Sequence, residues 1–195
     1  FAETEGGQII ANKDVRIALQ YAIDVPTICQ TLLGTECERA SSMVNAPNNN
    51  PNLTAYPYDP AKAEELLDAA GYPRGEDGTR FTLGFMAGKG RYLNDISVVP
   101  ALAQYLSDVG VNVELTQMEW GSEFVPLLRA HEVGPLFFVG TGGATWNAVY
   151  DLSDISAPDA ATNYTEWNNE EWFALWDSLA NVRDAAAERE ITDKL

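Results

Sequence analysis

The segment "YDPAKAEELLDAAGYP", residues 58–73, contains every signal expected of one short helix. Asp59 is a typical N-cap, and Pro60 suits the first helical position, where no backbone N–H is needed. Gly71 and Pro73 then end the helix. The apolar positions recur at helical spacing and predict the buried face: Ala63, Leu66, Leu67 and Ala70.

Upstream of this segment, "KDVRIALQYAI" (13–23) predicts another amphipathic helix, with its apolar residues on one face. Asp24 is the expected cap of a short helix that contains Pro26 and ends at Gly34. Residues 35–58 are rich in turn formers and have no periodicity. We expect this long loop to wrap the surface or to line a site.

Downstream, strands are expected at 81–86, 111–118 and 135–140, the last of them fully buried. Helices are expected between them, at 96–109 and near 122–130, the second capped by Ser122, and a last helix at 168–190. Strands that alternate with helices are usually parallel. The sequence therefore predicts an α/β fold, a mixed sheet with a βαβαβ core of parallel strands flanked by helices.

The overall charge narrows the classes of partner. The chain has 195 residues, with 29 acidic and 12 basic side chains, for a formal net charge of −17. Such a surface repels phosphate backbones and anionic membranes, and no basic stripe offsets it. No apolar run approaches the 18 or so residues that a membrane-spanning helix needs. Nucleic acid is therefore not an expected partner.

The two cysteines, Cys29 and Cys37, are too few for a four-cysteine zinc site, and the single histidine, His131, excludes a Cys₂His₂ site. Their spacing does not fit a C-x-x-C redox pair. A disulfide between a helix end and its following loop would suit an exported protein. Two unpaired buried thiols remain the alternative.

A ligand site is expected where the carboxyl ends of the parallel strands meet. Three loops reach that edge: "AGKGRYLND" (87–95), "EWGS" (119–122) and "GTGGATWN" (140–147). The glycine loop matches neither a dinucleotide fingerprint nor a P-loop, so we expect it to form one wall of a pocket. The candidate ligand-binding residues are Arg91, Asn94, Gly142, Gly143, Trp146 and Asn147, with Arg91 and Asn94 as a carboxylate or hydroxyl clamp.

The sequence gives little support to catalysis. It contains neither G-x-S-x-G nor H-E-x-x-H, and His131 at a helix end is expected to be structural. The many carboxylates are scattered over helix caps and polar faces. We expect no catalytic residue, no metal site and no cofactor, and a small α/β enzyme is the alternative interpretation.

Four features in order together resemble one family: "VRIALQYAID…I" (15–28), "YPYDPAKAEELLDAAGYP" (56–73), "GRYLND" (90–95), and then a strand followed by "W". The chain is similar, from about residue 12 to 190, to the second lobe of the peptide and nickel type of periplasmic solute-binding protein, family 5, of ABC importers. The resemblance implies that residues 1–195 are a single lobe, excised from a two-lobed binding protein. It implies a binding module and not an enzyme, although a sensor domain could reuse the fold.

The resemblance also implies a location and partners. Such a protein works in the periplasm or outside the cell, where a disulfide is stable, and an N-terminal segment not included here could carry a lipid anchor. It binds a small solute such as an oligopeptide or a sugar, between this lobe and the missing first lobe, and delivers it to a membrane permease. Family members often bind a peptide amine with an aspartate in the glycine loop. Here Ala144 or Asn147 stands at that position, and Asp151 is the nearest acid.

Overall fold

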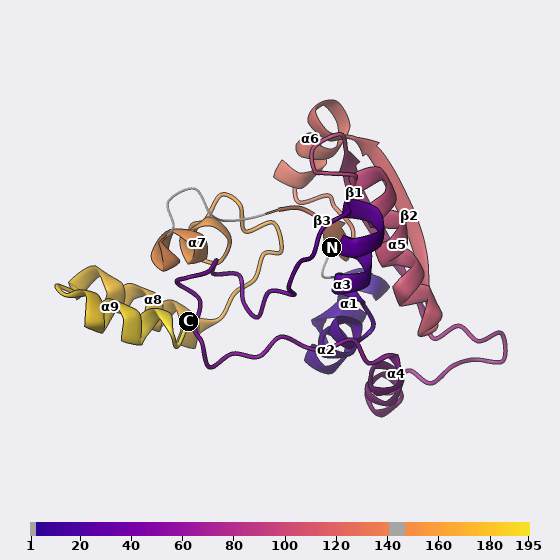
Figure 1. Cartoon of the computed structure of the whole chain (residues 1–195), viewed down its shortest axis with the longest axis horizontal. Helices are drawn as coiled ribbons and strands as arrows, with labels where there is room; N and C mark the ends of the chain where they lie inside the picture. The colour runs from indigo at the N-terminus through magenta and orange to yellow at the C-terminus, as the bar shows by residue number, and fades with distance from the viewer. Residues whose placement is uncertain (1–2, 141–146) are drawn as a thin grey trace. The chain divides into compact units, whose positions relative to one another are not determined.

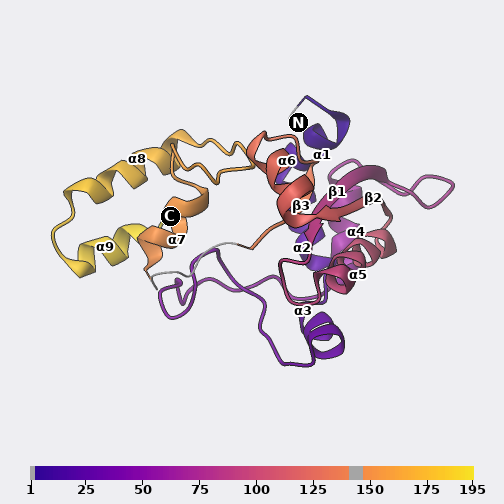
Figure 2. The same ribbon diagram turned by 90° about the horizontal axis from the view of Figure 1, so that it is seen from above.

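The computed structural model of the chain describes residues 3–140 and 147–195. It contains a parallel sheet of three strands. The chain forms two compact units: the first comprises Phe1–Arg39 and Tyr56–Val139, and the second comprises Ala40–Ala55 and Gly140–Leu195. Figures 1 and 2 show the ribbon in two views. Each unit is described by itself below.

The sheet of the first unit consists of β1 (Phe81–Lys89), β2 (Val111–Glu119) and β3 (Leu136–Phe138), in the order β2-β1-β3. Both neighbours pair parallel to β1, from Phe81↔Val111 to Lys89↔Glu119 and from Phe85↔Leu136 to Ala87↔Phe138. The predicted parallel core is therefore confirmed. Every strand pair among the described residues is parallel.

Before β2 the first unit contains α1 (Glu5–Ala11), α2 (Lys13–Tyr21), α3 (Val25–Ile28), the π-helix η1 (Cys29–Leu33), α4 (Pro60–Ala69) and α5 (Asp95–Asp108). Residues of α1, α2, α4 and α5 share one core cluster with β1. Helices α2 and α4 lie side by side (Figures 1 and 2). Alternate β1 residues face the core because strand side chains alternate between faces. The core cluster joins these strand residues to the apolar faces of the helices: Val15, Ala18, Leu19, Ala63, Leu67, Phe81, Leu83 and Leu106.

The helix at 60–69 has the caps that its sequence predicts. The side chain of Asp59 accepts a hydrogen bond from the backbone N–H of Lys62 at 2.9 Å, and Gly71 follows the helix with a φ of +94°. Buried behind it, the Arg80 guanidinium bonds to Glu64 at 3.1 Å and to Asp68 and the carbonyls of Tyr72 and Val109. These contacts fix α4 to the end of α5 and the start of β1.

Two boundaries in the first unit differ from prediction. β1 runs to Lys89 and not to residue 86, because Gly88 continues the pairing with β2 beneath the ring of Trp120. Ser122 caps no helix: the π-helix η2 (Trp120–Phe124) leads directly into α6 (Val125–Arg129), and the N–H of Glu119 bonds instead to the carboxylate of Glu123 at 2.7 Å. The sequence prediction of that cap was wrong.

Strand β3 and the last helix also differ from prediction. β3 is only three residues long, and its side chains are half-buried and not fully buried. The helix expected at 168–190 is divided into α8 (Glu170–Ser178), the short 3₁₀ turn η3 (Leu179–Asn181) and α9 (Ala185–Thr192). The break occurs because Asp184 caps a new helix by accepting the N–H of Ala187 at 2.9 Å.

The second unit is held together by hydrogen bonds between side chains of its helices and its loop 40–55. The carboxylate of Asp151, in α7 (Ala148–Ile155), accepts the backbone N–H of Asn45 at 2.9 Å. Arg189 donates to the carbonyls of Asn48 and Asn49. On α8, Trp172 stacks on Trp176 with 5.4 Å between ring centroids, and its indole N–H bonds to the carbonyl of Leu195.

Candidate functional site

The carboxyl ends of the three strands bring an aromatic cluster together. Because the strands are parallel, the loop after β1, the start of η2 after β2 and the end of β3 meet at one edge of the sheet. The ring of Tyr92, from the first of these, lies edge-on to Trp120 and to Phe138, each with 5.5 Å between centroids. Phe124 packs against Trp120 at 5.5 Å. We call these four rings the aromatic edge.

Arg91 is the exposed cation at the aromatic edge. Its guanidinium carbon lies 5.4 Å from the centroid of the Tyr92 ring and 5.9 Å from that of Trp120, which is within the range of cation–π attraction. Among the described residues, no carboxylate forms an ion pair with Arg91. Lys89, the other cation at this edge, is paired with Glu119 at 3.3 Å. Arg91 therefore presents a positive charge, oriented by two rings, that an anionic group could approach.

Asp95, the first residue of α5, follows this loop, and its carboxylate was not among the candidates predicted from the sequence. Its side chain is 3% exposed and accepts the backbone N–H groups of Gly90, Arg91 and Tyr92 at 3.1, 2.9 and 2.8 Å. Burial raises the pKa of Asp95, but these N–H donors lower it by more, so its pKa lies below the ordinary value. The signal was available in "GRYLND": an acid placed directly after a glycine turn and at the first position of a helix.

The other candidate ligand-binding residues belong to different elements of the structure. Asn94 has a left-handed φ of 50° and donates its side-chain amide to the carbonyl of Leu32 at 2.8 Å, which ties the loop to η1. Asn147 belongs to the second unit, where its side chain caps α7 by accepting the N–H of Tyr150 at 3.0 Å. Gly142, Gly143 and Trp146, and also Ala144, lie outside the described residues. Of the six candidates, Arg91 and Asn94 are thus together in one loop.

Asp151, the acid nearest to the glycine loop, is 1% exposed and bonded to Asn45. Its carboxylate therefore contributes to the interior of the second unit.

The disulfide prediction is confirmed. Cys29, at the start of η1, is bonded to Cys37 in the following loop, with 6.0 Å between their Cα atoms. Cys37 also lines a hollow with Pro26, Gln30, Glu36 and Glu38. The same loop is tied back to α2, because Arg39 donates to the carbonyl of Ile23 at 3.0 Å and to the side chain of Gln20.

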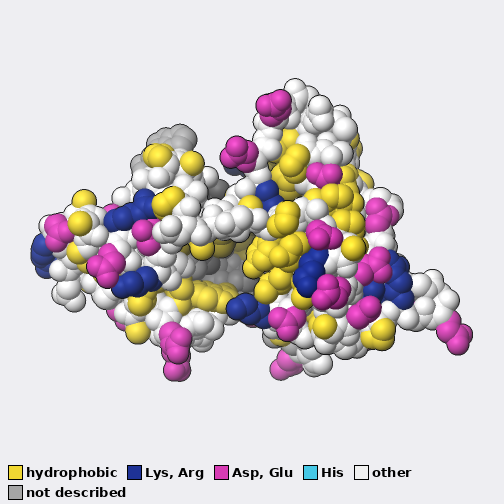
Figure 3. Space-filling view, turned by 60° about the horizontal axis from the view of Figure 1, so that its bottom comes forward, with side chains coloured by type: hydrophobic (Ala, Val, Ile, Leu, Met, Phe, Trp, Pro, Cys, Tyr) yellow, Lys and Arg dark blue, Asp and Glu magenta, His cyan; other side chains and the backbone are white. Residues whose placement is uncertain are grey.

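Other kinds of site find little support in the part of the chain that the structure describes. It has no group of three His, Cys, Asp or Glu side chains that could hold a metal ion. None of the helices in residues 3–140 and 147–195 has the length and apolarity needed to cross a membrane. Figure 3 shows one face, on which acidic side chains are scattered and the basic ones form no continuous stripe.

Comparison with known proteins gives a family match over most of the chain. Residues 4–163 match the family model described as bacterial extracellular solute-binding proteins, family 5 Middle. Glutathione-binding protein GsiB of Pectobacterium atrosepticum is 31% identical over 166 residues, which is 81% of this chain and 31% of that protein. GsiB of Escherichia coli K12 is 30% identical over 158 residues, or 75% of this chain and 28% of that protein. The chain thus spans about a third of the length of these curated relatives.

Solved structures share the fold. The periplasmic binding protein DppA from Helicobacter pylori, in complex with the peptide STSA, matches 99% of this chain with a TM-score of 0.83 and 20% identity, over 36% of its own length. NikZ from Campylobacter jejuni, in complex with Ni(L-His), matches 98% with a TM-score of 0.81 and 20% identity, over 40% of its length. At such identity these matches show the fold alone. The family match agrees with them: the chain belongs to the bacterial extracellular solute-binding proteins, family 5.

Proposed function

We propose that this chain is one lobe of the solute-binding component of an ABC importer, which works in the periplasm or outside the cell. The whole protein would hold a small solute in its interlobe cleft and deliver it to a membrane permease. Family membership supports this function, and the relatives that match are binding proteins and not enzymes. The missing first lobe and the permease are the proposed partners.

The solute class that we propose is a peptide-like molecule with a carboxylate. The single observation that carries this proposal is Arg91, an exposed guanidinium held over two aromatic rings with no carboxylate partner in the described part of the chain. Guanidinium groups match carboxylates geometrically because two parallel N–H groups can bond to its two oxygens. Glutathione and the peptide STSA, named for two similar proteins, both carry carboxylates.

The proposed contact residues are Arg91, Asn94, Gly142, Gly143, Trp146 and Asn147. Arg91 would supply the charge. Trp146 would supply an apolar ring on which the solute could stack. Asn94 and Asn147 already have one side-chain hydrogen bond each within the protein, so they would bind the solute through the amide N–H and C=O groups that remain.

The test uses the full-length polypeptide that carries these residues, purified without denaturation. Mass spectrometry identifies the solute that it carries, and calorimetry measures its affinity for reduced glutathione and for the peptide STSA. Arg91→Ala should weaken binding about tenfold or more, since a hydrogen bond to a charged group contributes about 1.5–3 kcal/mol. Lys89→Ala is the matched control because Lys89 is already paired with Glu119.

A wild-type protein that carries and binds no solute would contradict the function itself. Wild-type affinity in Arg91→Ala would contradict only the assignment of this residue. Trp146→Ala should likewise cost affinity without unfolding the protein.

A further inference from the structure

The backbone of the loop after β1 is held by one carboxylate. Asp95 is almost fully buried, and its two oxygens accept three consecutive N–H groups, those of Gly90, Arg91 and Tyr92. Gly90 has a φ of +80°, a conformation that side chains disfavour, and it turns the chain so that these N–H groups converge. The three residues therefore cannot move independently of the Asp95 side chain.

Two of these residues make the contacts of the aromatic edge. Arg91 carries the guanidinium, and Tyr92 is the ring that touches both Trp120 and Phe138. A change in the backbone at 90–92 would move the charge and the central ring together. The position of Asp95 thus determines where the charge of Arg91 is presented.

The charge of Asp95 makes this arrangement strong. Hydrogen bonds from N–H groups to an ionised carboxylate are roughly twice as strong as neutral ones. The lowered pKa of Asp95 means that the group is ionised at neutral pH despite its burial. A loop that is already ordered before the solute arrives loses less conformational entropy on binding, and this raises affinity.

We propose that Asp95 is a positioning residue for solute binding, which holds Arg91 and Tyr92 in their binding orientation without touching the solute. This inference rests on the proposed function and adds a residue that acts through the loop. A purely structural role predicts something different: loss of the carboxylate would lower stability but would leave affinity unchanged in the protein that still folds.

The experiment compares Asp95→Asn with Asp59→Asn in the full-length polypeptide. Asparagine keeps the size of the side chain but removes the charge and one acceptor oxygen. Asp59 also accepts a backbone N–H at the start of a helix, at 2.9 Å, but it caps α4 and does not belong to the aromatic edge. Calorimetry measures affinity for reduced glutathione and for the peptide STSA. Deuterium exchange with mass spectrometry reports on the amides of residues 90–92, and thermal unfolding reports on stability.

We expect Asp95→Asn to weaken binding about tenfold or more and to speed exchange at 90–92, while Asp59→Asn binds as the wild type does. Wild-type affinity in Asp95→Asn, or an equal loss in both variants, overturns the proposal. If Asp95→Asn does not fold, the solute-free wild type decides: fast exchange at 90–92 overturns the proposal, and slow exchange supports it. If the wild type binds neither probe, the proposed solute class fails, and the effect of Asp95→Asn on exchange still tests the role of Asp95.

Discussion

The ring of Trp120 lies directly on the backbone of Gly88, so closely that a Cβ atom at residue 88 would be 2.5 Å from Cε3 of the ring and 3.1 Å from the Trp120 Cα. The glycine is therefore needed where β2 ends against β1. Since part of the clash is with backbone, a rotamer change of the tryptophan cannot relieve it. The close approach also sets the position of Trp120 in the aromatic edge.

Gly88→Ala should destabilise the chain by about 1–3 kcal/mol, the usual cost of overpacking a tight site. It should also change the near-ultraviolet circular dichroism of the Trp120–Tyr92 pair. Urea unfolding measures the first effect. Gly121→Ala is the matched control, because a Cβ atom there would have nothing within 4 Å. Equal stability in the two variants would show that the Gly88 contact is looser than described.

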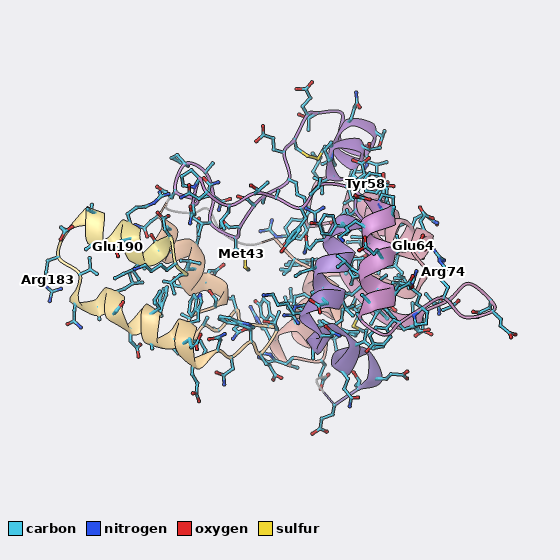
Figure 4. All side chains as sticks on the ribbon, turned by 90° about the horizontal axis from the view of Figure 1, so that it is seen from below. Met43, Tyr58, Glu64, Arg74, Arg183 and Glu190 are labelled. Atoms are coloured by element: carbon cyan, nitrogen blue, oxygen red, sulfur yellow. A yellow bond between two sulfur atoms is a disulfide. The ribbon has the colours of Figure 1, made fainter. Side chains whose placement is uncertain are left out.

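Arg80 should be the most important cation for the stability of the first unit. Its side chain is 2% exposed and bonds to two carboxylates and two carbonyls, whereas Arg74 nearby is 34% exposed. Figure 4 shows Arg74 beside Glu64, the carboxylate that both arginines share. Arg80→Ala should cost about 3 kcal/mol, and Arg74→Ala about 1 kcal/mol or less. Denaturant titrations of both variants would contradict this if the order were reversed.

The disulfide between Cys29 and Cys37 should stabilise the chain modestly. The two residues are 8 apart in sequence, and closing a loop of that length removes about 2.5 kcal/mol of entropy from the unfolded chain in the usual model. The double variant Cys29→Ser with Cys37→Ser should lose up to that amount in urea unfolding. Thiol titration of the unreduced wild type should find no free thiol, and a count of two would contradict the bond.

The success of the sequence predictions depended on the range of the interactions. The helix at 60–69 was predictable because Asp59, Pro60 and Gly71 act within one or two turns. The end of β1 was not, because Gly88 stays in the strand through contact with Trp120, more than thirty residues away. The break before α9 had a local cause, the cap at Asp184, which the long apolar pattern concealed.

The candidate site shows the same difference between features that local sequence predicts and features that depend on contacts between distant residues. Parallel strands placed Arg91 and Trp120 at one edge, as their positions after the strands predicted. The role of Asp95 depends on three N–H groups converging on one carboxylate, which residue spacing alone does not specify. Arg80 was missed because its partners come from α4, from Tyr72 after it and from Val109.

The 195-residue chain alone should bind solute much more weakly than the full-length protein does. It spans about a third of its curated relatives, and we propose that the other lobe supplies the remaining contacts. A solute bound to one lobe stays exposed to water on its other side, so less of its surface is buried. Calorimetry on the folded chain with reduced glutathione and the peptide STSA tests this. A dissociation constant of about 1 μM or tighter would contradict the idea that the chain is half a site.

The contribution of Asp95 to stability should depend on pH in a specific direction. The pKa of this carboxylate in the folded chain lies below its ordinary value of 3.8, so between the two values the unfolded chain binds more protons. The stabilisation is therefore fully present above about pH 5 and is lost as the pH falls below 3.8 towards the folded pKa. Other carboxylates also titrate in this range: the pKa of Glu64, for example, is lowered by its bonds to Arg74 and Arg80. Asparagine at position 95 cannot titrate. The difference in unfolding free energy between the wild type and Asp95→Asn therefore isolates the contribution of Asp95. Urea unfolding from pH 6 down to about pH 2.5 should show that difference shrinking as the pH falls. A difference that stays constant over the series would mean that the Asp95 carboxylate is not the charged acceptor of the three loop N–H groups.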